Sequence, residues 1–120
     1  MTTTARKRLE VRTAVPSDVR AILRDHTGAM WFGTGGGGLT RLRHGRMQAF
    51  TSAQGLSSDY VRVLFEDEQG VLWVGGSGGL ACWKHGRFLA LDPTAGLPDN
   101  VISQIFKDER GALWLGSNRG

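Results

Sequence analysis

One short phrase occurs three times in this chain and limits what it can fold into. The phrase has the form Asp-x-x-Gly-x-Leu/Met-Trp-x-Gly, and its tryptophans are Trp31, Trp73 and Trp114, spaced 42 and then 41 residues apart. A period of roughly 40–45 residues, with short apolar runs between glycines, is typical of four-stranded β-propeller blades. Because one such unit cannot bury its apolar face alone, the fold depends on how many copies stack.

Four positions of each phrase are interpreted as structural repeat positions. The aspartate can accept local backbone N–H bonds, and the first glycine can adopt a positive φ. The tryptophan is expected to pack against the neighbouring blade, with its indole N–H satisfied locally. These positions are Asp25, Gly28, Trp31, Gly33, Asp67, Gly70, Trp73, Gly75, Asp108, Gly111, Trp114 and Gly116.

Strands are predicted on both sides of each phrase. Runs rich in β-branched and aromatic residues precede it and predict first strands at 19–24, 61–66 and 102–107. Glycine-rich linkers are predicted at 33–38 and 75–79, followed by third strands at 39–43 and 80–84 and fourth strands near 47–51 and 88–91. Two His-Gly pairs, at 44–45 and 85–86, read as two-residue hairpins with positive φ at both residues.

The predicted fold class is all-β: a partial β-propeller of four-stranded antiparallel blades, with about two and a half blades and one N-terminal outer strand. On this count the third blade is truncated after its second strand. The predicted segments are a basic tail (1–8), the outer strand and connector of a preceding blade (9–18), blade 1 (19–60), blade 2 (61–101) and the first half of blade 3 (102–120).

The repeated phrase, together with Gly-Leu-Pro-Asp-Asn at 96–100, resembles the two-component regulator propeller repeat. The resemblance covers the chain from about residue 9 to residue 120. It implies a propeller at the extracytoplasmic end of a bacterial sensor protein, whose surface binds a ligand, commonly a carbohydrate, and biases a signalling dimer. In such proteins a further β-domain, a membrane helix and a kinase or cyclase module follow. This chain carries no signal peptide and no motif of an output module, so we expect a non-catalytic fragment.

The amino-acid composition excludes several classes of partner and environment for this chain. The net charge of +4 comes mostly from the first twelve residues, where Arg6, Lys7, Arg8 and Arg12 outweigh Glu10, and the rest of the chain is close to neutral. A short basic terminus without interleaved aromatic residues does not predict nucleic-acid binding. Cys82 is the only cysteine, which excludes an intrachain disulfide, and no apolar run is long enough to span a membrane.

Candidate ligand-binding residues lie where each connector meets the next first strand. Loops on one propeller face surround the central channel, and their residues differ among the copies here. A mixture of charged, amide and phenol groups suits a hydroxyl-rich or charged small ligand, although solvated loops would look similar. The candidates are Asp18, Arg20, Asp59, Tyr60, Arg62, Asp99, Asn100 and Ser103.

No catalytic constellation, cofactor or metal site is predicted. His26, His44 and His85 fall in turns of the repeats and are expected to be spread around a rim, too far apart to share an ion. The glycine run at 33–38 leads into a strand and not a helix, unlike a phosphate-binding loop.

Two alternative functions stay open. One is a fragment of a propeller enzyme similar to streptogramin lyases, which would need a histidine and a glutamate at the channel mouth. The other is a purely structural interaction module.

Two and a half blades would leave apolar faces uncovered at both ends. The expected partners are therefore further propeller blades in cis, or copies of the chain that close the ring. We expect the isolated chain to be an oligomer or a poorly stable piece of a longer product.

Overall fold

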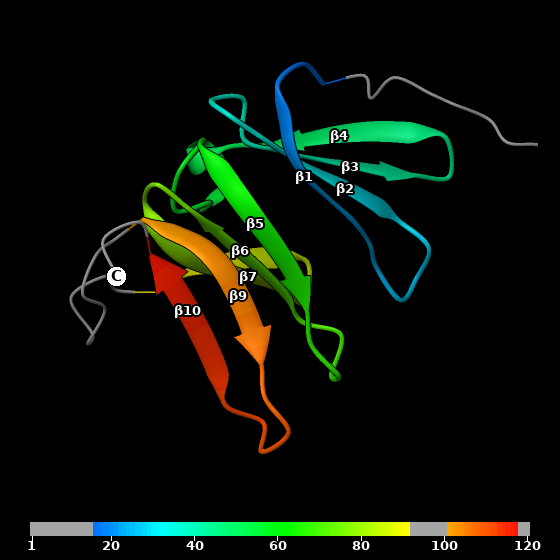
Figure 1. The fold of residues 1–120 in the computed structure, drawn as a ribbon. Helices are drawn as coiled ribbons and strands as arrows, with labels where there is room; N and C mark the ends of the chain where they lie inside the picture. Colours follow the sequence, from blue (N-terminus) through cyan, green and yellow to red (C-terminus); the bar gives the residue numbers. More distant parts are fainter. Residues whose placement is uncertain (1–15, 92–100, 118–120) are drawn as a thin grey trace, which may run out of the picture.

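A computed structural model describes residues 16–91 and 101–117, and in them the chain forms three successive antiparallel sheets (Figure 1). The first sheet contains β1 (Val19–Arg24), β2 (Met30–Thr34), β3 (Leu39–Arg43) and β4 (Arg46–Phe50). The second contains β5 (Val61–Glu66), β6 (Leu72–Gly76), β7 (Gly79–Lys84) and β8 (Arg87–Ala90). The third contains β9 (Ile102–Lys107) and β10 (Leu113–Ser117), and one 3-10 turn, η1 (Ser52–Gln54), joins the first two sheets.

In each sheet every strand pairs with its neighbour in sequence, which is a meander. This arrangement confirms the predicted fold class, an all-β partial propeller with two four-stranded blades and two strands of a third. The expected basic tail (1–8) and outer strand lie outside the described residues. None of the helical segments within the described ranges has the length and apolarity needed to cross a membrane.

The turns follow from local chemistry. His44 and Gly45 have φ of 51° and 76°, and His85 and Gly86 have φ of 53° and 77°, so both hairpins have the predicted positive φ at both turn residues. Such turns match the twist of the strands that they join. The hairpins β3–β4 and β7–β8 are therefore built in the same way.

The glycines after each tryptophan are strand residues, contrary to the predicted linkers. β2 runs to Thr34 and β6 runs to Gly76, so only the middle of each glycine-rich segment is a turn. The reason lies in the next blade: Val61 lies against the space where a Gly33 side chain would be, and a Cβ on Gly75 would be 2.8 Å from Ile102 Cγ2. Glycine at these positions lets the first strand of the next blade approach closely.

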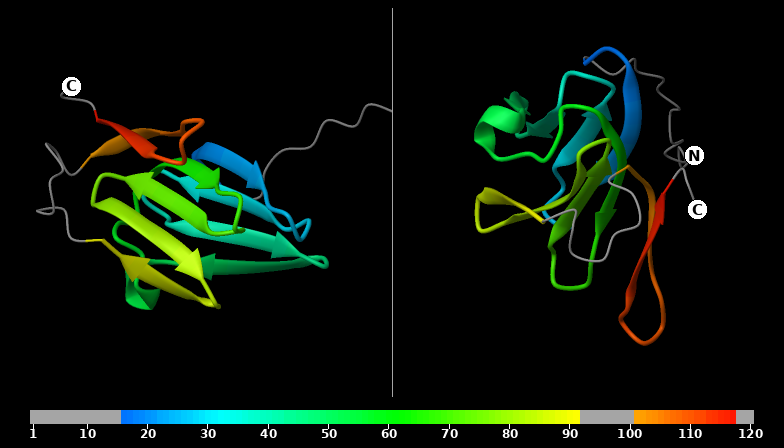
Figure 2. Two further views of the ribbon diagram at one scale, coloured as in Figure 1. Left: turned by 90° about the horizontal axis from the view of Figure 1, so that it is seen from below. Right: turned by 90° about the vertical axis from the view of Figure 1, so that its left-hand side faces the viewer.

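The sheets stack face to face in chain order (Figure 2). β5 packs on β1 and β2, and β9 packs on β5 and β6. The main apolar core lies between the first two sheets and includes Trp31, Leu39, Phe50, Leu56, Val61, Leu72, Val74 and Phe88. The blade is therefore the structural unit, but the core forms between blades.

Trp83 completes this core from β7. Its ring lies 5.6 Å from the ring of Trp31, 5.0 Å from that of Phe50 and 4.7 Å from that of Phe88, measured between centroids. The guanidinium of Arg41 lies 5.5 Å from the same ring. Trp83 is therefore a packing residue between the first two blades.

Large apolar side chains are exposed on both outer faces of the stack. Ile22 on the first sheet is 58% exposed, and Phe106 and Trp114 on the third sheet are 65% and 64% exposed. Leu89, on the outermost strand of the second sheet, is also exposed. Their counterparts at the first junction, Leu64 on β5 and Leu23 and Trp31 on the first sheet, are packed against the core.

Candidate functional site

The two ends of the blades differ in construction. At one end, which we call the connector end, β1 and β5 begin and β2 and β6 finish, and the segment between β4 and β5 passes nearby. At the other, the hairpin end, lie the Asp-x-x-Gly turns and the two His-Gly hairpins. The candidate ligand-binding residues that the structure describes belong to the connector end.

A hollow of about 320 Å³ opens between the first two blades at the connector end. Its lining combines an acid, two arginines and a phenol with small residues that leave room. The lining residues are Asp18, Arg20, Gly35, Tyr60, Val61, Arg62 and Ser77. The structure thus brings together four of the eight candidates, from both sides of one junction.

An ion pair forms the wall on the first blade. Arg20 Nε donates to Asp18 Oδ1 at 2.9 Å, and this hydrogen bond raises the pKa of the Arg20 guanidinium above its ordinary value. Asp18 has φ of 56°, and its carbonyl accepts from the N–H of Gly35 at 3.1 Å. Both charged side chains are about half exposed, so their outer atoms remain open to a ligand.

Tyr60 stands on the opposite wall with its side chain exposed. Its backbone pairs with Gly35 in an isolated bridge, and its carbonyl accepts from the N–H of Ser77 at 3.1 Å. The phenol lies close to Gly36, where a Cβ would be 3.5 Å from the ring. A fixed backbone below an exposed ring gives a ligand a firm surface to pack on.

Arg62 supplies an unopposed charge beside this ring. It is exposed, and no ion pair among the described residues engages it. With Asp18 and Arg20 paired to each other, the hollow carries a net positive charge. It can therefore bind a polar ligand through hydrogen bonds and accept a negative group.

The other candidates lie elsewhere or are occupied. Asp59 Oδ1 accepts from the N–H of Ser52 at 2.8 Å, so this carboxylate orders the connector. The Ser103 hydroxyl donates to the carbonyl of Gly116 at 3.3 Å within the third sheet. Asp99 and Asn100 lie outside the described residues.

Sequence reasoning missed Gly35 and Ser77. They occupy equivalent places, two residues after the glycine that closes each phrase. The sequence pattern assigns those places to the linkers, and the predicted candidates all lie on the first-strand side of each junction. Comparing the copies two residues beyond that glycine would have found them.

At the hairpin end, each phrase folds into a turn organised by its aspartate. Asp25 Oδ1 accepts from the N–H groups of Thr27 at 2.9 Å and Ala29 at 3.0 Å. Its Oδ2 accepts from the indole Nε1–H of Trp31 at 2.8 Å. Burial alone would raise the pKa of Asp25, but the hydrogen bonds from Thr27, Trp31 and the backbone bring this pKa below its ordinary value.

The hydrogen bond from the tryptophan indole to the aspartate recurs in the other two copies of the phrase. Asp67 accepts from the Trp73 indole at 3.0 Å and Asp108 accepts from the Trp114 indole at 2.7 Å. The hydrogen bond from Trp114 is the main reason that the pKa of Asp108 is lowered. The recurring aspartates are therefore engaged with their own turns in all three copies.

His26 joins two blades. Its Nδ1 lies 2.6 Å from Glu66 Oε2, and its backbone N–H donates to the same oxygen at 3.1 Å. The bond to Glu66 raises the pKa of His26 above its ordinary value of 6.5. Within the described ranges, no group of three or more His, Cys, Asp or Glu side chains is placed to hold a metal ion.

The family model described as two-component regulator propeller matches residues 15–36, 55–78 and 96–119. The chain belongs to this family. Each matched segment ends three residues after the glycine of a Trp-x-Gly phrase and covers the first two strands of one sheet, so the family model matches the repeat found in the sequence. The comparison with curated proteins gave no significant match.

Solved propeller structures resemble this member of the family. The extracellular domain of the hybrid two-component system BT3049 from B. thetaiotaomicron matches with a TM-score of 0.75 and 25% identity over 85% of this chain. That of BT4673 from the same organism matches with a TM-score of 0.70 and 26% identity over 83% of it. The chain spans only 14% and 15% of the lengths of those two structures.

Proposed function

We propose that this chain is the part of a sensor-type propeller that contributes to ligand recognition, and that it carries out no chemistry of its own. The hollow at the connector end is the recognition site, and its ligand is a carbohydrate or another small polar molecule. Tyr60 supplies a packing surface, Arg62 an open charge, and Asp18 with Arg20 a pair of hydrogen-bonding groups. The parent is a two-component-type sensor protein.

The observation that carries this proposal is the convergence of side chains from two blades on one hollow in a propeller of the two-component regulator family. Its similarity to the extracellular domains of hybrid two-component systems adds support. The alternative enzyme needs a histidine and a glutamate at the channel mouth, and neither is among the residues that line the hollow.

We also propose that the exposed faces of the stack are covered by further repeats of this family, from the same polypeptide or from a second copy that closes the ring. Charges at the two junctions support this. His26 meets Glu66 at the first junction, and at the second the polarity is reversed, with Lys107 Nζ 3.8 Å from Glu68 Oε1. The turn residue of one blade thus faces an opposite charge at the end of the next first strand.

On the two outer faces, the charged residues at the equivalent positions have no neighbouring blade to pair with among the described residues. Glu109 is the turn residue of the third sheet, and Arg24 ends the first strand of the first sheet; both are exposed. A repeat that follows the third sheet should therefore end its first strand with a basic residue. Size-exclusion chromatography with light scattering tests the covering: we expect association or a low, broad melting transition, and a sharply melting, non-aggregating monomer would contradict it.

The recognition site is tested by protein-observed NMR with a panel of neutral and charged oligosaccharides. A ligand should shift the amide signals of Gly35, Tyr60 and Ser77, and Tyr60→Ala should abolish the shifts. Arg110→Ala, an exposed change at the hairpin end, is the matched control and should leave them unchanged. Binding that survives both Tyr60→Ala and Arg62→Ala would show that the hollow is not the site.

A purely structural interaction module would behave differently. No member of the panel would then shift these amides, yet a protein partner would still be captured by the Tyr60→Ala variant. That result would replace ligand recognition with an interaction role for the same fold.

A further inference from the structure

The outer hairpins of both blades carry only positive charge. No Asp or Glu occurs between Leu39 and Phe50 or between Gly79 and Leu91, although both stretches contain several basic residues. These basic residues are Arg41, Arg43, Arg46, Lys84 and Arg87. The near-neutral balance of the chain outside its terminus therefore conceals a separation of charge, with the acids on the inner strands, the connectors and the turns.

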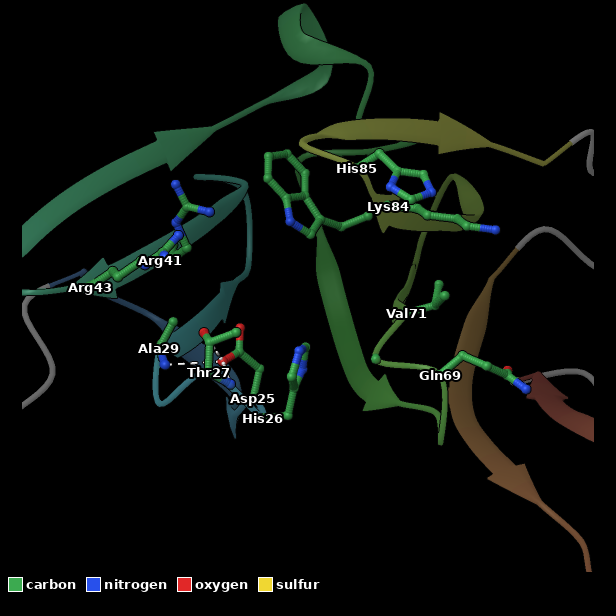
Figure 3. A pocket seen from close by; sticks show the side chains of 12 residues that line it. Asp25, His26, Thr27, Ala29, Arg41, Arg43, Gln69, Val71, Lys84 and His85 are labelled. Carbon is green, nitrogen blue, oxygen red and sulfur yellow. Dashed lines mark hydrogen bonds between the residues drawn. The ribbon is translucent and has the colours of Figure 1, made fainter.

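A groove of about 400 Å³ lies between these hairpins, at the hairpin end of the first junction (Figure 3). Arg41 and Arg43 reach it from β3, and Lys84 and His85 reach it from β7 and its turn. The turn that contains Thr27 forms another part of the wall. Basic residues of both blades thus line the groove.

The one acid among the lining residues, Asp25, offsets only one of the three positive charges of Arg41, Arg43 and Lys84. Both oxygens of Asp25 already accept hydrogen bonds, including one of 2.6 Å from the Thr27 hydroxyl and one from Trp31. By contrast, no hydrogen bond or ion pair among the described residues engages the side chains of Arg43 or Lys84. The groove therefore presents unpaired cations to the solvent.

The arrangement is repeated from blade to blade. Arg43 and Arg46 flank one His-Gly turn, and Lys84 and Arg87 flank the equivalent turn of the next blade. A row of cations at the spacing of the blades suits an extended ligand with repeated negative groups better than a single small anion. Counterion release along such a row would supply the affinity.

The surroundings of the groove select among polyanions. The Trp83 ring is half-buried and already packs against three aromatic rings and the Arg41 guanidinium, which leaves little of it open for stacking a nucleic-acid base. The hairpin tips, at 43–46 and 84–87, contain no apolar side chain that could enter a lipid surface. Thr27 and Gln69 add neutral polar groups of the kind that bind hydroxyls.

We propose that this basic groove binds an anionic polysaccharide that carries sulfate or carboxylate groups along its chain. Arg43 and Lys84 contact the negative groups from the two blades, and Arg46 and Arg87 extend the row beyond the groove. The site is separate from the connector-end hollow and does not depend on it.

Binding of fluorescent heparin to the full chain by anisotropy tests the sulfate form, and polygalacturonate as a competitor tests the carboxylate form. Arg43→Ala/Lys84→Ala should weaken heparin binding by about tenfold or more and make its salt dependence shallower. Arg43→Lys/Lys84→Arg, which keeps the charges, should restore most of the affinity. Unlabelled neutral dextran should not compete.

Matched controls separate the groove from general charge. Arg24→Ala/Arg110→Ala removes the same charge from outside the groove and should change the affinity by less than about threefold. Tyr60→Ala should leave heparin binding unchanged, which separates this proposal from the recognition site. The proposal is overturned if Arg6→Ala/Lys7→Ala/Arg8→Ala accounts for the binding. Equal losses in both double variants would also overturn it, as would single-stranded DNA or anionic vesicles binding as tightly as heparin through the same residues.

Discussion

The two junctions between blades use the same phrase but bury its tryptophan to different extents. At the first junction Trp31 is 1% exposed, because Trp83 from the third strand of the next blade packs against it at 5.6 Å. At the second junction Trp73 faces a sheet whose described part consists of β9 and β10, and it stays half-buried. The burial of each tryptophan therefore depends on the outer strands of the following blade.

The hydrogen bond from the indole to the aspartate inside each turn does not depend on the outer strands of the following blade. The distance from the indole nitrogen to its aspartate is 2.8, 3.0 and 2.7 Å in the three copies, although Trp114 is 64% exposed. The comparison separates two roles of one phrase. The aspartate and the indole fix the turn locally, and the neighbouring blade supplies the apolar burial.

The largest expected effect is at the buried tryptophan. Trp31→Ala should destabilise the chain by about 3–5 kcal/mol, because it empties the centre of the core between the first two blades. Urea denaturation followed by circular dichroism measures this, and Trp31→Phe provides a milder variant if the alanine variant does not fold. Trp114→Ala is the matched control and should cost about 1 kcal/mol or less. Equal losses at both positions would contradict the difference between the junctions.

A smaller effect is expected at the aspartate of the first turn. Asp25→Ala should cost roughly 1–3 kcal/mol, because it leaves the Trp31 indole and two backbone N–H groups without their acceptor. Since the pKa of Asp25 is lowered in the folded chain, its stabilising contribution is present above the ordinary pKa of 3.8. It is lost as the pH falls through the lower folded value. The variant should therefore lose less stability than the parent chain between pH 4 and pH 2, and an unchanged acid sensitivity would count against this role.

The smallest effects concern the charges that cross the junctions. Glu66→Gln should return the pKa of His26 toward 6.5, as measured by NMR titration of the ring protons, because the bond to Glu66 is what raises it. The stabilising contribution of this pair is present below pH 6.5 and is lost as the pH rises through the raised value. At the second junction Glu68→Gln should have little effect on stability, since that side chain is 85% exposed. A larger loss of stability from Glu68→Gln than from Glu66→Gln would contradict the expected order of the two pairs.

Features set by neighbouring residues could be predicted from the sequence. The first strands fall at the predicted positions, and the His-Gly turns have the expected positive φ, because local chemistry decides both. The predicted assignment of the glycines after the tryptophan to linkers is wrong, since the role of Gly33 is set by Val61 of the next blade. The sequence pattern also does not show that the aspartate of the same phrase accepts from the indole N–H.

The candidate site was predictable only in part. Asp18, Arg20, Tyr60 and Arg62 share one hollow, but Asp59 is taken up by the backbone of Ser52. That contact depends on the path of the connector through η1, which the sequence pattern does not show. The basic groove was missed for another reason: averaging charge along the chain cancels cations of the outer hairpins against acids that lie elsewhere in space.

Hydrogen exchange of the indole N–H groups, followed by NMR on the intact chain, tests the separate roles of turn and burial most directly. All three indoles share the bond to aspartate, so any difference among them reports the covering by the next blade. We predict slowest exchange at Trp31, intermediate exchange at Trp73 and fastest exchange at Trp114. Equal exchange at the three tryptophans, or slower exchange at Trp114 than at Trp31, would contradict the claim that the following blade provides the burial.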